Sequence, residues 1–160
     1  LKLTGPIGTG FPLEKKERIG IVAGGIGLAP MIYLCNSLHK NIDFYVGFRE
    51  RSFYTDEIKN CVENLYISTD SGLEGHSGLI TEVFEPEKYD VVYTCGPVPM
   101  MKKAVDMCRD NNIPVYISME RRMACGIGAC LGCSIETTLG MKKVCKDGPV
   151  FKGEEVFFND

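Results

Sequence analysis

The sequence lacks a strong excess of charge of either sign. Its 160 residues carry 18 Lys and Arg against 21 Asp and Glu, which leaves a formal net charge of −3. This balance argues against binding to nucleic acid or to an anionic membrane surface, since both need a basic patch. No apolar run approaches the length of a membrane span, and no basic segment followed by an apolar stretch marks a secretory signal. We therefore expect a cytoplasmic protein with no membrane span and no nucleic-acid partner.

Cysteine, in contrast, is plentiful. The chain has 8 cysteines, and four of them fall within a short stretch near the carboxyl end. Disulfides would suit a short secreted chain, but the missing secretory signal favours a reducing compartment and thiolate ligands. The periodicity of neighbouring apolar residues places Cys35, Cys61 and Cys108 on the buried faces of helices, where cysteine packs as a small hydrophobic residue.

Apolar strands alternate with amphipathic helices over residues 18–118. Strands are expected at 19–22, 41–50, 65–72, 89–97 and 113–120, with helices after residue 30 and at 55–65, 76–84 and 99–112. Such alternation predicts a doubly wound α/β fold, with a parallel sheet of about five strands covered on both faces.

The pattern changes after residue 118, and this divides the chain. Residues 119–160 are rich in glycine and cysteine and contain few helix-forming patterns. This predicts a small irregular domain that needs a bound metal or a cross-link to stabilise it. Residues 18–118 form the predicted nucleotide-binding domain. The chain begins with Leu1, and residues 1–17 are expected to be a linker or the remnant of a preceding domain.

The last four cysteines follow the pattern C-x4-C-x2-C-x11-C: Cys125, Cys130, Cys133 and Cys145. This is the plant-type spacing for a [2Fe–2S] cluster. Glycines between the first three cysteines let the loop turn sharply and let backbone N–H groups approach the sulfurs. Zinc sites usually pair two short hooks, and here the fourth ligand stands alone. Zinc, disulfides and free thiols remain the alternatives.

Three turns that follow strands point to a nucleotide site. Gly25 and Gly27 precede a helix whose first turn holds Pro30, although the dinucleotide fingerprint would place a third glycine there. A second turn contains Cys95, Gly96 and Pro97, and a third offers Thr69 and Asp70 as partners for a ribose or amide. Turns at the carboxyl ends of parallel strands meet in one crevice. Cys95 is expected in its mouth, beside the reactive ring of a cofactor.

The stretches GGIGLAP, STDSG and TCGPVPMM, in this order, resemble the pyridine-nucleotide half of the ferredoxin reductase superfamily. Together with ERRMACGIGACLGC and the later Cys145, essentially the whole chain resembles the electron transfer subunits of NAD-dependent dihydroorotate dehydrogenases. The cysteine loop with its lead-in is the most specific part of this resemblance.

The resemblance implies cofactors, a partner and site roles. Members of this family pass electrons from an FMN-containing catalytic subunit, which oxidises dihydroorotate in pyrimidine biosynthesis, through a [2Fe–2S] cluster and FAD to NAD⁺. The four clustered cysteines would hold the cluster. Gly25, Gly27 and Pro30 would lie near the pyrophosphate, and Thr69 and Asp70 toward the adenosine. Cys95, Gly96 and Pro97 would lie near the nicotinamide, with Cys95 as the candidate catalytic residue.

One part of the family pattern is missing. The arginine-aromatic-serine motif of the FAD barrel is absent, and residues 1–17 resemble the link from that barrel. FAD is therefore expected in a longer subunit, and this chain alone is not expected to complete the electron path. The rival interpretations are a related subunit of a sulfite reductase, a hydrogenase or a ferredoxin–NADP system and, from another class, an interaction module stapled by zinc. Choosing NAD over NADP rests on the resemblance alone.

Overall fold

The computed structural model describes residues 5–38 and 41–158. Residues 1–4 of the predicted linker lie outside this part. The strands are β1 (Arg18–Gly24), β2 (Asn41–Phe48), β3 (Asn64–Thr69), β4 (His76–Ser77), β5 (Val91–Cys95), β6 (Val115–Ser118), β7 (Ser134–Thr137), β8 (Gly140–Lys143) and β9 (Val150–Lys152). The helices are α1 (Leu28–Leu38), α2 (Thr55–Lys59), α3 (Val98–Asp110) and α4 (Gly153–Val156), with 3-10 turns η1 (Gly25–Gly27), η2 (Ile80–Glu82) and η3 (Pro86–Lys88).

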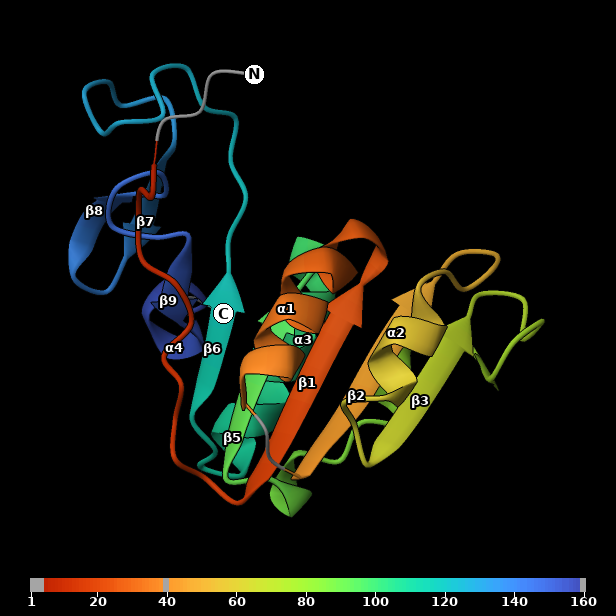
Figure 1. Ribbon diagram of the computed structural model, residues 1–160. Coiled ribbons are helices and arrows are strands. Elements are labelled where there is room, and N and C mark those ends of the chain that lie inside the picture. Colours follow the sequence, from red (N-terminus) through yellow and green to blue (C-terminus); the bar gives the residue numbers. More distant parts are fainter. Residues whose placement is uncertain (1–4, 39–40, 159–160) are drawn as a thin grey trace.

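The predicted parallel sheet is confirmed, and it is larger than expected. Seven strands pair in the order β4-β3-β2-β1-β5-β6-β9. All neighbours are parallel except β6 and β9, which run antiparallel. The five predicted strands form its continuous middle, and β4 and β9 extend the two edges (Figure 1). The carboxyl ends of the parallel strands consequently meet along one rim of the sheet.

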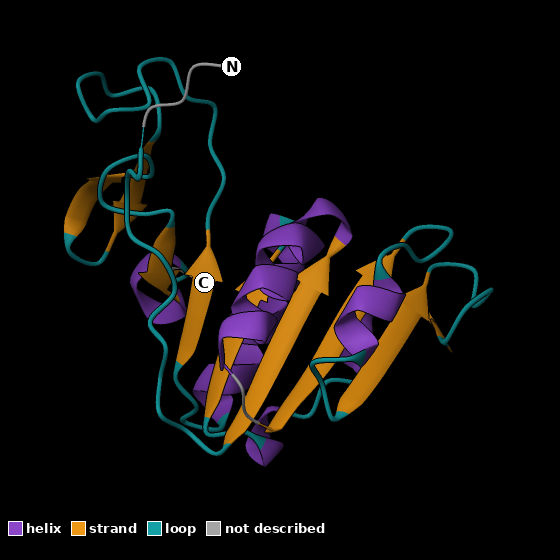
Figure 2. Cartoon of the chain, in the orientation of Figure 1, coloured by secondary structure: helices purple, strands orange, loops and turns teal. Residues whose placement is uncertain are grey.

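Helices cover both faces of the sheet, as in a doubly wound fold. Figure 2 shows α1 and α2 in front of the strands and α3 behind them. In β1 the side chains alternate between two cores: Ile19 and Ile21 lie in the core under α1, whereas Val22 lies in the core under α3. This two-sided burial explains why β1 reads as a continuous apolar run.

The buried faces of the two longer helices are also as predicted. In α1 the buried side chains include Met31, Leu34, Cys35 and Leu38, and in α3 they are Met101, Ala104, Val105 and Cys108. Both sets repeat at the helical period, so each helix presents one apolar stripe to the sheet.

Two predicted helices are wrong in type or length. The predicted helix 76–84 is the short strand β4 followed by η2, because Gly78 adopts φ 122° and donates its N–H to the carbonyl of Thr69. The predicted helix 55–65 ends at Lys59, without a side-chain cap from Thr55. Cys61 therefore lies after the helix and is half-buried, not in a helical core.

The segment before β1 is hydrogen-bonded both to the sheet and to the tail. The Tyr93 hydroxyl donates to the carbonyl of Pro12 at 2.8 Å and accepts the N–H of Glu14 at 3.2 Å. Tyr116 donates to the Glu14 carboxylate at 2.9 Å. At its other end, Thr9 donates its N–H to the carbonyl of Gly148 at 2.6 Å. We call residues 9–14 the strap, because they join the sheet to the tail.

The tail, residues 119–158, is not separate from the sheet. Its strand β9 pairs with β6, and α4 follows β9 directly. Within the described residues, the second sheet consists of the hairpin of β7 and β8. The proposed boundary at residue 118 stays a prediction. In the part of the chain that the structure describes, no helix is long and apolar enough to cross a bilayer.

Candidate cysteine centre and nucleotide cleft

The hairpin of β7 and β8 brings two of the clustered cysteines together. Cys133 immediately precedes β7, Cys145 follows β8, and Ser134 is in register with Lys143. The N–H of Cys145 consequently points at the sulfur of Cys133 at 3.5 Å, and both residues are buried. Gly140, at φ 92°, lies at the tip, where a left-handed backbone closes the turn.

The glycine-rich loop brings the other two cysteines together. Cys130 donates its N–H to the sulfur of Cys125 at 3.3 Å. Gly128 joins the two pairs, because its N–H donates to the sulfur of Cys145 at 3.1 Å. Gly128 has φ 77° and Gly126 has φ 70°, so both positions require the freedom of glycine. As expected from the sequence, the glycines let backbone donors reach the sulfurs.

These hydrogen bonds favour thiolates at two of the four positions. The N–H groups of Cys130 and Ile127 lower the pKa of Cys125 to about 6. The N–H of Cys145 lowers the pKa of Cys133. Cys145 has a raised pKa, chiefly because it hydrogen-bonds to Cys133. Metal centres bind the thiolate form, so each pair holds one sulfur prepared to bind.

The geometry helps to separate the alternatives for this centre. The eight cysteines are free thiols, with no disulfide among them in the described residues. In the same residues, no three Cys, His, Asp or Glu side chains group closely enough to hold a single metal ion. The backbone hydrogen bonds arrange the four thiols as two pairs that are joined through Gly128.

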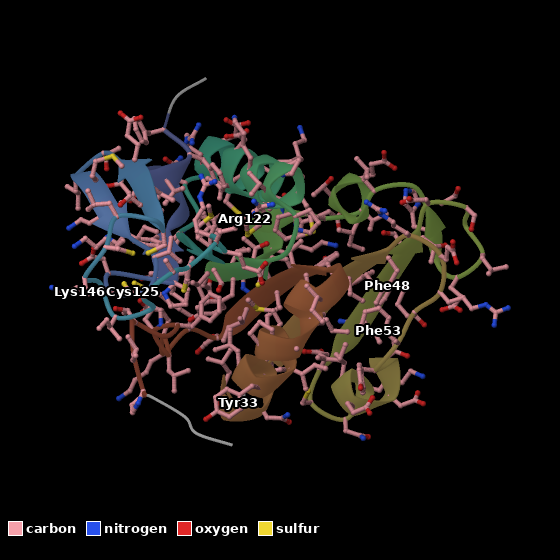
Figure 3. The ribbon with its side chains drawn as sticks, turned by 90° about the horizontal axis from the view of Figure 1, so that it is seen from above. Tyr33, Phe48, Phe53, Arg122, Cys125 and Lys146 are labelled. Carbon is pink, nitrogen blue, oxygen red and sulfur yellow. The ribbon has the colours of Figure 1, made fainter. Side chains whose placement is uncertain are left out.

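Positive charge and exposed apolar side chains surround the cysteine loop. Lys143 donates to the carbonyl of Gly128 at 2.7 Å, which fixes the loop against the hairpin. The Lys146 side chain lies beside Gly128, and Figure 3 shows Arg122 between this end and the middle of the molecule. Ile127 and Leu131 are 59% and 74% exposed, so the loop has little core of its own. Cations here would offset the net negative charge of an iron–sulfur centre.

A cleft of about 820 Å³ lies along the rim where the parallel strands end. Its walls come from the ends of β1, β2 and β3, from η2 and from the start of α3; they include Gly24, Gly25, Ile26, Gly47, Phe48, Arg49, Glu50, Arg51, Phe53, Ser68, Asp70, Gly78, Leu79, Ile80, Thr81, Pro97, Pro99, Met100 and Lys103. In open α/β sheets, ligands bind at this edge. The volume suits a ligand of nucleotide size.

Three of the predicted nucleotide residues line the cleft: Gly25, Asp70 and Pro97. Gly27 lies behind the wall, where a Cβ atom would come within 2.3 Å of the Cys95 carbonyl oxygen, so glycine allows η1 to pack against β5. Gly96 is likewise close to Gly24. Pro30 is exposed in the first turns of α1.

The remaining two predicted residues are buried and do not line the cleft. Thr69 is buried, and its hydroxyl donates to the carbonyl of Glu74 at 3.1 Å and accepts its N–H at 3.2 Å. Cys95 is 3% exposed at the end of β5, and burial raises its pKa to about 11 despite a hydrogen bond from Ser118. At neutral pH its thiol is therefore uncharged. The role of Cys95 beside a cofactor stays a prediction.

The aromatic and basic walls of the cleft were not predicted from the sequence. Phe48, the last residue of β2, and Phe53 pack edge to face with ring centroids 4.9 Å apart (Figure 3). Both side chains line the cleft. Lys103 reaches the cleft from α3. A lysine in a helix and a phenylalanine in a loop carry no sequence signal of a site, since only the folded rim places them together.

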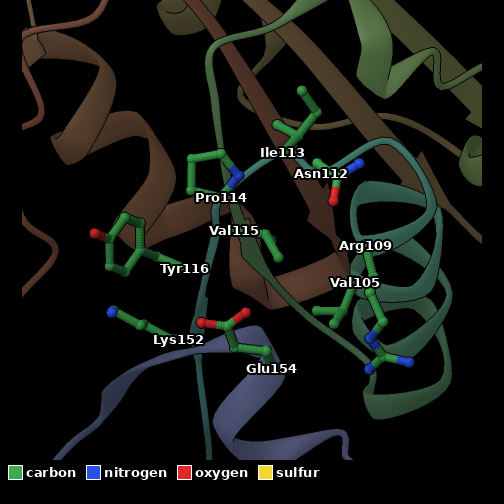
Figure 4. Close-up of a pocket in the computed structure, with 9 residues that line it drawn as sticks. All are labelled: Val105, Arg109, Asn112, Ile113, Pro114, Val115, Tyr116, Lys152 and Glu154. Atoms are coloured by element: carbon green, nitrogen blue, oxygen red, sulfur yellow. The ribbon is translucent and has the colours of Figure 1, made fainter.

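A smaller hollow of about 340 Å³ lies between α3, β6 and α4. Figure 4 shows Arg109 from α3 and Glu154 from α4 at its walls, with Lys152 beside Glu154. Arg109 forms an ion pair with Asp106 at 3.2 Å and donates to the carbonyl of Phe157. This arginine thus anchors the end of the chain to α3, and the hollow lies at the opposite end of β6 from the cleft.

Comparison with known proteins agrees with the cysteine geometry. Residues 120–157 match the family described as the iron–sulfur cluster binding domain of dihydroorotate dehydrogenase B. This segment contains both thiol pairs and the hairpin between them. The match supports iron–sulfur binding over the zinc-stapled alternative.

A solved structure described as NADH-dependent reduced ferredoxin–NADP oxidoreductase superposes with a TM-score of 0.87 over 98% of this chain and 59% of that chain, at 28% identity. The C-terminal domain of a hydrogenase from Pyrococcus furiosus superposes with a TM-score of 0.57 at 16% identity, which shows the fold alone. Two of the three rival types, the ferredoxin–NADP system and the hydrogenase, thus have solved structures that share the architecture.

Similarity to curated relatives is much higher. The electron transfer subunit of dihydroorotate dehydrogenase B (NAD(+)) from Clostridium acetobutylicum is 50% identical over 100% of this chain and 66% of its own length. The Clostridium perfringens protein of the same description is 49% identical over 99% of this chain and 67% of its length. The chain thus spans about two thirds of the length of these relatives. At this identity and coverage, the chain belongs to the family of electron transfer subunits of NAD-dependent dihydroorotate dehydrogenase B.

Proposed function

We propose that this chain carries electrons between a [2Fe–2S] cluster and a nicotinamide dinucleotide, as part of an electron transfer subunit that serves a dihydroorotate-oxidising partner. The observation that carries the proposal is the combination of two thiol pairs in the tail with a nucleotide-sized cleft at the rim of the sheet. An iron–sulfur cluster supplies one-electron transfer, and the dinucleotide accepts a hydride.

The tail would hold the cluster with Cys125 and Cys130 on one iron and Cys133 and Cys145 on the other. The support is the pairing of sulfurs by the loop and by the hairpin. Backbone N–H groups that donate to the sulfurs would stabilise the reduced, more negative state and tune its potential. The chain's own contribution is thus to keep four thiolates in place and to surround them with donors.

The cleft would hold the dinucleotide along the carboxyl ends of the strands. Gly25 is the proposed pyrophosphate contact, because its φ of 54° in η1, just before α1, leaves the backbone open on the cleft side. Asp70 is proposed to contact the adenosine ribose, and Pro97 to face the nicotinamide with Cys95 behind it. We propose NAD as the nucleotide on the family membership, since the cleft wall carries both basic residues (Arg49, Arg51 and Lys103) and acidic ones (Glu50 and Asp70).

A flavin is needed between the two sites, because a cluster gives up single electrons whereas nicotinamide takes a hydride. We propose that FAD is bound by the longer subunit that the relatives represent, and that electrons enter from the FMN of the catalytic partner. This chain alone would then bind cluster and nucleotide without catalysing the full transfer.

The experiment is anaerobic reconstitution of the chain with iron and sulfide, followed by metal analysis and visible absorption. We expect two irons and two sulfides per chain, as the [2Fe–2S] formula requires. The matched variants are Cys133→Ser, which removes a proposed ligand, and Cys108→Ser, which changes a buried cysteine of α3. Cys133→Ser should lose the cluster and Cys108→Ser should retain it.

Nucleotide binding is measured on the same material by calorimetry with NADH and NADPH. The Asp70→Asn variant should weaken NADH binding about tenfold, the worth of one hydrogen bond to a charged group. Reconstituted protein without iron, or with a single zinc and no visible absorption, would overturn the cluster assignment. Equal binding of both nucleotides would overturn the choice of NAD.

A further inference from the structure

Two cysteines outside the proposed centre meet on the α1 face of the sheet. Cys35 lies on the inner side of α1, and Cys61 follows the end of α2. The sulfur of Cys35 donates to the carbonyl oxygen of Cys61 at 3.3 Å, across 26 residues of sequence. The sulfur of Cys61 in turn lies 3.2 Å from the carbonyl oxygen of Ile58. Neither cysteine has a part in the proposed function.

The two thiols differ in exposure, and they interact directly. Cys35 is 1% exposed, whereas Cys61 is half-buried. Burial is the largest cause of a raised pKa at Cys35, and a hydrogen bond from thiol to thiol raises it further. The pair thus consists of a more accessible thiol with a buried thiol directly behind it. An adduct on the outer sulfur lies beside the inner sulfur, which attacks once it gives up its proton.

An opening leads to the pair from solvent. A cavity of about 540 Å³ has both cysteines in its wall, and its other lining residues are Asn36, Asn41, Asn60, Val62 and Glu63. Three amide side chains around a thiol offer donors and acceptors for the peptide-like groups of a small disulfide. The cavity is separate from the nucleotide cleft, with which it shares no lining residue.

We propose that Cys35 and Cys61 form a reactive dithiol, which low-molecular-weight disulfides such as oxidised glutathione convert into an intramolecular disulfide. The Cys61 thiolate attacks one glutathione sulfur, which forms a Cys61–glutathione disulfide and releases one glutathione thiolate. The Cys35 sulfur then attacks the Cys61 sulfur and releases the second glutathione, which takes up the Cys35 proton. Two protein thiols lose two electrons in total, and one oxidised glutathione becomes two reduced ones.

The consequence of the new bond is a covalent link across the α1 face. It would join α1, which begins at the glycine turn, to the segment between α2 and β3. A cross-link between elements 26 residues apart restricts the unfolded chain, so oxidation should raise the thermal midpoint by several degrees.

The test treats the chain anaerobically with oxidised glutathione and maps tryptic peptides without reduction. The expected product links peptide 19–40 to peptide 60–88. In the Cys35→Ser variant, one glutathione should remain on Cys61. In Cys61→Ser, Cys35 should stay unmodified. The readout identifies peptides, so it is independent of whether the tail carries a cluster and of nucleotide binding.

The matched control is Cys108, a buried cysteine of α3. Oxidised glutathione should modify the Cys108 thiol at least about tenfold more slowly than the Cys35–Cys61 disulfide forms. Cys108→Ser should form the same link as the original chain. The proposal is overturned if glutathione accumulates on Cys61 in the original chain without closure, or if neither cysteine reacts before Cys108 does. Closure only after unfolding in denaturant would overturn it as well.

Discussion

The sheet and the cysteine-rich tail are held in place by different physical means. In the sheet, the side chains of Phe44, Tyr45 and Tyr93 are fully buried, and both faces of β1 are covered. In the loop of the tail, large apolar side chains such as Ile127 and Leu131 are mostly exposed. The tail depends instead on a hairpin, on left-handed glycines and on hydrogen bonds to sulfur. Apolar burial therefore stabilises one region, whereas local geometry around four thiols defines the other.

This difference separates positions that determine folding from positions that determine ligand binding. A change in the sheet core should lower the stability of the whole chain. A change in the cysteine loop should alter metal retention and leave the sheet folded, because few of its side chains reach the core. Of the described residues in and next to the hairpin, Cys133, Ile135, Val144 and Cys145 belong to the buried cluster under α3.

The largest expected effect comes from the sheet core. Phe44→Ala removes a fully buried ring from β2, so it should lower the free energy of unfolding by about 3–5 kcal/mol, through lost burial and the cavity left behind. The matched change in the tail is Leu131→Ala, at a side chain that is 74% exposed, and it should cost less than about 0.5 kcal/mol. Urea unfolding followed by far-UV circular dichroism measures both. Similar losses from the two variants would contradict the comparison.

An intermediate effect is expected from the glycines of the cysteine loop. Gly128→Ala places an alanine in the left-handed backbone conformation, and its Cβ would lie 2.8 Å from the Lys146 side chain. The same residue donates the N–H that reaches the sulfur of Cys145. Gly126→Ala has a similar backbone cost, but open space surrounds its Cβ position. We expect a chelator to remove iron from Gly128→Ala about fivefold faster than from Gly126→Ala, in line with roughly 1 kcal/mol for the displaced side chain and weakened hydrogen bond.

The experiment on the glycines also separates the two regions. Urea unfolding of the sheet should be the same in the two glycine variants within about 0.5 kcal/mol, since neither position touches the sheet core. Equal rates of iron loss from Gly126→Ala and Gly128→Ala would show that the N–H of Gly128 has no special part in holding the sulfur of Cys145.

Sequence patterns predicted the elements in which burial and chemistry repeat regularly. The five central strands and the apolar faces of α1 and α3 followed from periodicity, because buried side chains recur at a fixed spacing along a strand or a helix. The four clustered cysteines were identifiable from spacing alone. They stay close because Cys133 and Cys145 flank the hairpin, which was only partly visible as a strand-like segment near Cys145.

Elements that depend on single backbone conformations or on distant pairing were missed. The segment 76–84 has apolar residues at helical spacing, but Gly78 and its bond to Thr69 favour a strand and a 3-10 turn. Strand β9 is three residues long and owes its place to β6, so no local pattern marks it. Thr69 is a similar case, because its hydroxyl is used within its own turn by Glu74.

The smallest expected effect concerns the strap, which joins the two regions. Tyr93→Phe removes the hydroxyl that holds Pro12 and Glu14, at a cost of about 0.5–1.5 kcal/mol in local stability. Hydrogen exchange at the N–H of Glu14 should accelerate about two- to tenfold, whereas Tyr33→Phe, at a residue that is 79% exposed on α1, should leave it unchanged. Unchanged exchange at Glu14 would contradict a clamping role for Tyr93.

The contact between Thr9 of the strap and the tail shows how strongly the sheet and the tail are coupled. Thr9 donates to Gly148, and Val150 donates back to Thr9, so these two N–H groups report on the contact with the tail. If the strap acts as one rigid segment, Tyr93→Phe should accelerate exchange at both of them as well. If they keep their protection while Glu14 loses it, the tail holds the strap independently. Loosening the sheet end would then leave the cysteine centre undisturbed, as expected for two regions with separate sources of order.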